Sequence, residues 1–161
     1  MKPEFIIALT SIVIAGAALF VTIWQGFVTR RHNRLMVRPV FRIDRDELND
    51  QPIRIILHNV GVGPGFIDRF DVMVDGANIV GDRVTRMNTA MDRIGLREYR
   101  IQYFSPSIGE AINVGESQAL IKITVSVNNT PIFNTMIAVL PRLTFSIAYK
   151  SIYGETYYVN G

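Results

Sequence analysis

The feature that most constrains this chain is an uncharged, apolar run near its amino terminus, residues 5–28. As a helix these 24 residues would be about 36 Å long, enough to cross a hydrocarbon core of about 30 Å. The run is longer than the apolar region of a signal peptide, and it leads into a basic segment instead of a small-residue cleavage site. Trp24 lies near its basic end, as is typical of an aromatic belt at the headgroup level. We therefore expect a single transmembrane helix that stays attached to the protein.

The basic residues on either side of this run predict its orientation. Only Lys2 precedes it, whereas six arginines follow it closely: Arg30, Arg31, Arg34, Arg38, Arg42 and Arg45. By the positive-inside rule, the segment with more Lys and Arg stays in the cytoplasm. We therefore predict a single-pass protein of the bacterial inner membrane with a cytoplasmic carboxyl-terminal domain, and the absence of cysteine agrees with that location.

Small and polar residues recur at heptad spacing along the same run. A 3.5-residue repeat of small residues lets helices pack closely in a left-handed bundle, whereas a lone helix in lipid gains nothing from it. We interpret the repeat as a face for homo-oligomerisation and call it the small-residue stripe. The alternative is a plain anchor whose small residues align partly by chance. The predicted interface consists of Ala8, Ser11, Ala15, Ala18, Thr22 and Gln25.

The net charge of +3 comes from the region next to the predicted membrane span. Residues 46–161 contain ten Lys and Arg against twelve Asp and Glu, a balance of −2. The surplus therefore fits contact with anionic lipid headgroups of the bilayer. Binding of long duplex nucleic acid is disfavoured, because that affinity requires a broad field of phosphate contacts.

The chain divides into a transmembrane helix (1–29), a basic juxtamembrane linker with the first strand (30–45), and a β-rich domain (46–161). Most apolar runs in the domain have strand length and composition. Residues 84–95 have helical periodicity, with Val84, Met87, Met91 and Ile94 on one side. Residues 131–140 fit either a helix or a strand. The expected fold is an antiparallel, sandwich-like β domain with one or two short helical insertions. The expected strands are 37–44, 52–60, 66–74, 97–104, 119–127, 143–149 and 156–159.

Residues for catalysis or metal binding are scarce. The chain has no cysteine and only two histidines, His32 and His58, so neither a zinc site nor a Ser-His-Asp set is well supplied. The Gly-rich segment 61–65 is followed by a strand, whereas phosphate-binding loops are followed by a helix. We therefore predict a turn or bulge there, with ligand contact as the alternative. We expect a protein without catalytic residues, metal or cofactor.

An arginine-rich segment stands out within the domain. Five arginines lie within 18 residues, at positions 83, 86, 93, 97 and 100, with aromatic residues nearby. Arginine forks suit phosphates and aromatic faces suit bases, so the combination favours a short or cyclic oligonucleotide. The alternative is a solvated arginine face or a set of salt bridges between subunits. The predicted ligand-binding residues are Arg86, Arg93, Arg97, Arg100 and Tyr103.

Three segments resemble motifs in small bacterial proteins that have one amino-terminal span and a β-rich domain: TRRHNRL at 29–35, LHNVGVGPG at 57–65 and YKSIYG at 149–154. In size and layout the chain also resembles the small membrane effectors of type III CRISPR systems. That resemblance implies a cytosolic domain that binds cyclic oligoadenylate and a membrane part that harms the infected cell. We therefore expect an oligomeric membrane sensor in antiviral defence. The alternative is a noncatalytic anchor or scaffold that recruits a partner protein to the inner membrane.

Overall fold

The computed structural model describes residues 2–47, 52–97, 99, 101–124 and 130–161. The chain forms two compact units, Met1–Met36 and Val37–Gly161. Helix α1 (Pro3–Met36) makes up the first unit. Within the described residues, α1 is the one helix long and apolar enough to cross a membrane.

Helix α1 continues without interruption from the apolar run through the basic segment, and none of its residues is buried. Two hydroxyl groups of the small-residue stripe are bonded within the helix. The Ser11 hydroxyl donates to the Ile7 carbonyl at 2.9 Å, and the Thr22 hydroxyl donates to the Ala18 carbonyl at 2.8 Å. These hydroxyls therefore need no partner from a neighbouring helix, and any association along the stripe would rest on the close approach of small side chains.

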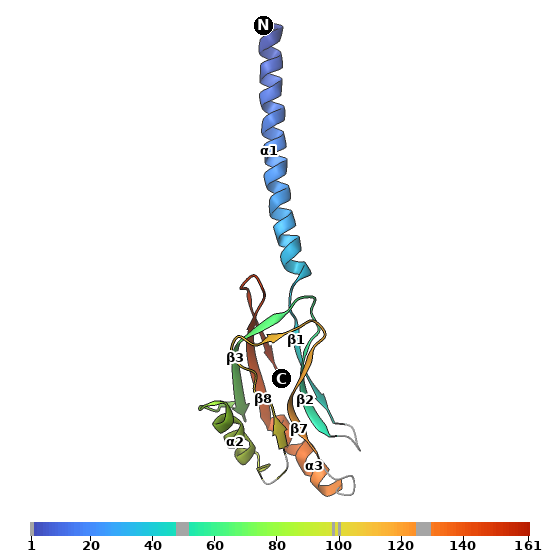
Figure 1. The fold of residues 1–161 in the computed structure, drawn as a ribbon, viewed down its shortest axis with the longest axis vertical. Coiled ribbons are helices and arrows are strands. Elements are labelled where there is room, and N and C mark those ends of the chain that lie inside the picture. The colour runs from blue at the N-terminus through green and yellow to red at the C-terminus, as the bar shows by residue number, and fades with distance from the viewer. Residues whose placement is uncertain (1, 48–51, 98, 100, 125–129) are drawn as a thin grey trace. The chain divides into compact units, whose positions relative to one another are not determined.

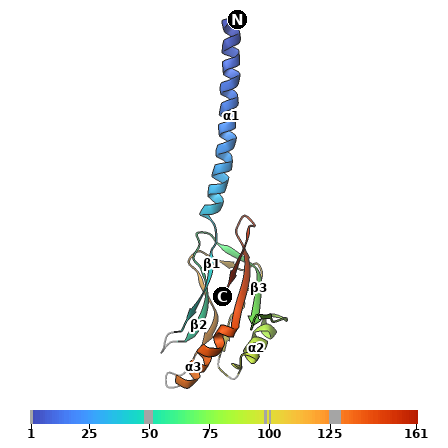
Figure 2. The same ribbon diagram turned by 180° about the vertical axis from the view of Figure 1, so that it is seen from behind.

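The second unit is an antiparallel β-sandwich with two short helices, which confirms the predicted fold class (Figures 1 and 2). The strand order is β1-β2-β7-β5 in the first sheet and β4-β3-β8-β9 in the second, where β6 also pairs with β3. The first sheet consists of β1 (Phe41–Asp46), β2 (Ile53–Asn59), β5 (Ile101–Tyr103) and β7 (Ser117–Ile123). The second consists of β3 (Gly65–Val74), β4 (Ala77–Asn78), β6 (Ala111–Ile112), β8 (Leu143–Lys150) and β9 (Thr156–Asn160).

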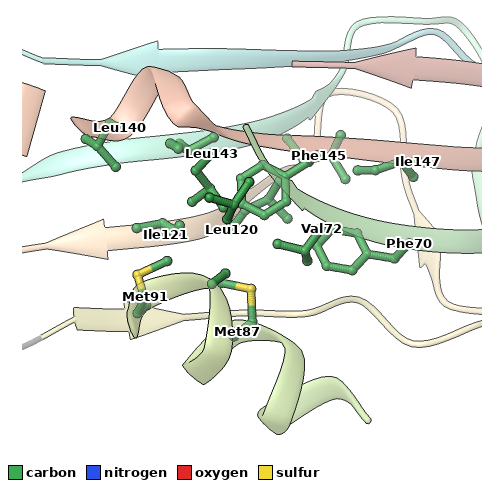
Figure 3. Packing of buried hydrophobic residues seen from close by; sticks show 14 of the residues in the cluster. Phe70, Val72, Met87, Met91, Leu120, Ile121, Leu140, Leu143, Phe145 and Ile147 are labelled. Carbon is green, nitrogen blue, oxygen red and sulfur yellow. The ribbon is translucent and has the colours of Figure 1, made fainter. Parts of the chain in front are cut away.

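The core lies between the two sheets and is made of alternating apolar residues. Ile53, Ile55 and Leu57 of β2 are buried while their neighbours are half-buried, the period-2 pattern of a strand with one face inward. Phe145 of β8 is fully buried and stacks on Phe70 of β3 with ring centroids 5.6 Å apart. Figure 3 shows these rings together with the neighbouring side chains from both sheets. Burial of such side chains contributes about 1.5–3 kcal/mol each, so this cluster is the main source of the domain's stability.

Helix α2 (Arg83–Arg93) covers part of the core. Met87 and Met91 point from it toward the sheets (Figure 3), and Gly95 ends it with a φ of 74° that glycine adopts without strain. Val84, which the periodicity groups with Met87, Met91 and Ile94, is 58% exposed. It lies in the first turn, outside the core that Met87 and Met91 cover.

The remaining differences concern short elements. The segment 131–140, which fits either a helix or a strand by sequence, forms most of helix α3 (Thr130–Val139) and the start of a 3₁₀ turn, η1 (Leu140–Arg142). The strand expected at 97–104 is limited to β5, and residues 98 and 100 lie outside the described residues, as does the end of the strand expected at 119–127. Strands β4 and β6 were not predicted, because two-residue strands have no sequence periodicity.

The glycine-rich loop after β2 packs on the chain that enters the sandwich. Val60 N donates to the Val40 carbonyl at 2.8 Å, and Val62 N donates to the Arg38 carbonyl at 3.1 Å. A Cβ atom at Gly63 would overlap with the carbonyl oxygen of Val37. Glycine is therefore required here because two backbone segments lie against each other.

A buried asparagine fixes this contact. Asn59 is 1% exposed, and its Nδ2 donates to the carbonyls of Gly63 and Ile112 at 2.9 Å each. Its Oδ1 accepts from Gly61 N at 3.1 Å and from Val40 N at 3.4 Å. One side chain thus joins the entering chain, the glycine-rich loop and the segment before β7.

Candidate anion-binding cleft

A surface cleft of about 300 Å³ lies beside the start of α2. This volume is at the lower end of the range of about 300–1,000 Å³ that is typical of ligand pockets. Strand β3, the first turns of α2 and the segment before β6 supply its walls. We call it the arginine cleft. Its lining residues are Arg69, Phe70, Asp71, Arg83, Arg86, Pro106, Ser107 and Ile108.

Three arginines and one aspartate give the arginine cleft its charge. Arg69 Nε lies 3.0 Å from Asp71 Oδ2, and Arg86 Nη1 lies 4.0 Å from Asp71 Oδ1. Arg83 Nη1 donates to the Ser107 hydroxyl at 2.6 Å, which connects the start of α2 to the opposite wall. With one carboxylate against three guanidinium groups, the lining is positive and suits an anionic group.

Arg69 and Arg86 both form ion pairs with Asp71. Arg86 is the less exposed of the two, with 21% of its side chain exposed. Its Nη1 donates to the Phe70 carbonyl at 2.5 Å. Its Nε is buried and has no hydrogen-bond partner among the described residues. Arg86 is thus held against β3 by its terminal nitrogen, and an anion in the cleft would meet a guanidinium that is already in place.

Asp82 holds the start of α2. Its carboxylate accepts hydrogen bonds from Thr85 N and Val84 N at 2.9 Å each and from the Thr85 hydroxyl at 2.8 Å. The backbone hydrogen bond from Thr85 is the largest of the effects that lower the pKa of Asp82, against an opposing effect of burial. Asp82 is therefore ionised at neutral pH and keeps Arg83 and Arg86 at the cleft wall.

The structure places the predicted ligand-binding residues at different positions around α2. Arg86 lines the arginine cleft, whereas Arg93 is exposed in the last turn and Arg97 pairs with Asp92 at 2.9 Å. Tyr103 of β5 donates its hydroxyl to Asn88 Oδ1 at 3.0 Å. At 100° per residue, positions 86 and 88 lie about 200° apart around a helix. Arg86 and Asn88, the partner of Tyr103, are therefore on opposite flanks of α2. Arg100 lies outside the described residues.

Sequence reasoning missed the contribution of Arg69 to the cleft. Strict alternation from the buried Ile67 would place residue 69 on the inner face. A register shift between Ile67 and Arg69 in the β3–β8 pairing turns Arg69 outward beside Asp71 instead. Such bulges leave no periodic signal in a single sequence.

A second polar group lies on the outer face of the first sheet. The Ser117 hydroxyl is 2.8 Å from His58 Nδ1, and His58 Nε2 is 3.8 Å from Asp44 Oδ2. The second distance exceeds a hydrogen bond, and Asp44 pairs with Arg42 Nε at 2.6 Å. Residues on adjacent strands face each other here, His58 opposite both Arg42 and Ser117. We interpret this group as a cross-strand polar cluster.

Comparison with protein-family models and with curated proteins gives no match to this chain.

Proposed function

We propose that this chain is a membrane-anchored sensor whose β-sandwich binds an anionic ligand in the arginine cleft. The observation that carries the proposal is the cleft lining, three arginines against one aspartate in about 300 Å³. The guanidinium groups come from one strand and one helix, Arg69 from β3 and Arg83 and Arg86 from α2, so they present donors to a phosphate from two sides. The basic turns of α1 after the apolar run support a cytoplasmic location for the domain.

Cyclic oligoadenylate is the ligand class that we propose, in an antiviral setting of the type III CRISPR kind. A cleft of this size holds one nucleotide-sized group, so a cyclic ligand would extend beyond one protomer. Contact with clefts of several protomers would link ligand binding to assembly of the membrane helices. The ligand then changes the membrane state only if it binds one assembly more tightly than another.

The small-residue stripe provides the means of assembly in this proposal. Replacement of Ala15 and Ala18 by leucine is expected to weaken oligomers of the full chain in detergent, because larger side chains keep helix backbones apart. The matched control is leucine at Ile14 and Val21, two apolar residues of α1 outside the small-residue stripe. Chemical cross-linking measures both variants, and an equal loss of cross-linked species in the two would contradict a role for the stripe.

The ligand class is tested by titrating the detergent-solubilised full chain with labelled cyclic oligoadenylates, a linear oligoadenylate and inorganic phosphate. We expect the cyclic compounds to bind most tightly, with affinity falling as salt increases, because phosphate contacts are screened by ions. Binding of none of these anions would overturn the proposal and favour a scaffold that recruits a partner protein.

A further inference from the structure

Four connections of the sandwich meet at the end where the chain enters it. The pairings of Phe41 with Asn59, Phe66 with Lys150, and Lys150 with Thr156 place the start of β1, the β2–β3 loop and the β8–β9 turn together. Gly115 N donates to the Asn59 carbonyl at 3.0 Å, which adds the β6–β7 turn. Figures 1 and 2 show these loops gathered at one end of the sandwich.

These loops carry large apolar side chains that point away from the core. Six of them are between 40% and 62% exposed: Val40, Val60, Val62, Val114, Ile152 and Tyr153. We call this group the apolar tip. A cluster of exposed apolar side chains on neighbouring loops indicates an interaction surface, whereas single exposed residues are normal.

The carboxylates near the apolar tip are engaged within the domain. Glu116 accepts from Asn113 N at 2.8 Å, Glu155 accepts from the Tyr157 hydroxyl at 2.8 Å, and Asp68 pairs with Lys150 at 2.6 Å. Arg38 lies 4.9 Å from the centroid of the Tyr157 ring. Acidic groups at this end therefore have internal partners that reduce repulsion from an anionic surface.

The covalent connection to α1 limits how far this end can lie from a bilayer. The helix ends at Met36, and the Arg38 carbonyl is already bonded to Val62 N. The two intervening peptide units span at most about 7 Å. A helix rises about 12 Å from Val28, the end of the apolar run, to Met36. About 5–8 Å of that rise lies within the headgroup region of the bilayer. The length of this connection therefore limits the point where the chain enters the sandwich, at Arg38, to about 15 Å from the headgroups.

We propose that the apolar tip is a lipid-binding surface that inserts its valine, isoleucine and tyrosine side chains into the membrane interface. Tyrosine suits this position because its ring is apolar and its hydroxyl is polar. The inference rests on the membrane anchoring in the proposed function and adds a second membrane contact to it. Tip contact would fix the orientation of the sandwich on the bilayer surface.

Single cysteines can test the tip directly, because the chain has none of its own. The full chain is reconstituted into vesicles of phosphatidylethanolamine and phosphatidylglycerol with a fluorophore at Val62→Cys or Ile152→Cys. The matched controls are Val80→Cys and Tyr158→Cys, which are exposed positions outside the tip. Leu19→Cys in α1 reports on insertion of the helix itself.

We expect lipids with a nitroxide on the acyl chain to remove most of the fluorescence at positions 19, 62 and 152 and little at 80 and 158. Quenching at 19 without quenching at 62 and 152 would overturn the tip inference and leave the anchor intact. No quenching at 19 would contradict the anchor on which the inference depends. A tip label shielded from both the lipid nitroxide and aqueous iodide would instead indicate a protein contact and would also overturn the inference.

Discussion

Replacement of Asn59 by leucine is expected to lower the free energy of unfolding of the sandwich by at least about 3 kcal/mol. The side chain is buried and bonds two carbonyl groups and two backbone N–H groups. Leucine satisfies none of them, and each buried polar group left without a partner costs about 1–3 kcal/mol. Denaturant unfolding of the chain, followed by circular dichroism of the β domain, measures the change.

Asn113→Ala is the control for this substitution. Asn113 is also an asparagine in a connection at the same end of the sandwich, but its amide is exposed and bonds only to Glu116 among the recorded contacts. We expect a change within about 0.5 kcal/mol. Equal effects of the two substitutions would mean that Asn59 does not hold the entering chain and the glycine-rich loop together.

Replacement of Phe145 by alanine is expected to cost about 3–5 kcal/mol, the range observed when a buried aromatic ring is removed from a core. Phe145 has no exposed surface and stacks on Phe70, so its loss leaves a cavity in the core between the two sheets. Tyr158→Ala on β9 removes an aromatic ring that is 65% exposed and should change stability little. A small effect at Phe145 in the same unfolding experiment would contradict the packing of the two sheets.

The sequence was sufficient to predict the architecture because its strongest signals are local. The apolar run at 5–28, the run of strand length at 52–60 and the helical periodicity at 84–95 each predict one element without reference to the rest of the chain. The strand expected at 37–44 is the edge strand β1, which begins only at Phe41, two residues after Pro39, a residue without a backbone N–H. Elements that depend on tertiary contacts, such as β4 and β6, were missed.

The candidate site was harder to predict because its residues come from distant segments. The arginines of α2 were recognised as a group, but spacing alone does not show that Arg86 contacts β3 while Tyr103 contacts the other flank of the helix. Arg69 reaches the cleft through a register shift, and Ser107 closes it from the loop before β6. Both facts depend on contacts between residues far apart in sequence, a strand pairing for Arg69 and a side-chain hydrogen bond from Arg83 for Ser107.

Two double variants, compared in the same titration, test whether the arginine cleft binds an anionic ligand. Arg69→Glu/Arg83→Glu changes the cleft, and Arg93→Glu/Arg97→Glu makes the same change of charge at the other end of α2. Contacts of a charged group contribute about 1.5–3 kcal/mol each, so we predict that the cleft variant binds labelled cyclic oligoadenylate at least roughly tenfold more weakly. The Arg93/Arg97 variant should lose much less affinity. Equal loss in both variants, or full binding by the cleft variant, would contradict the assignment.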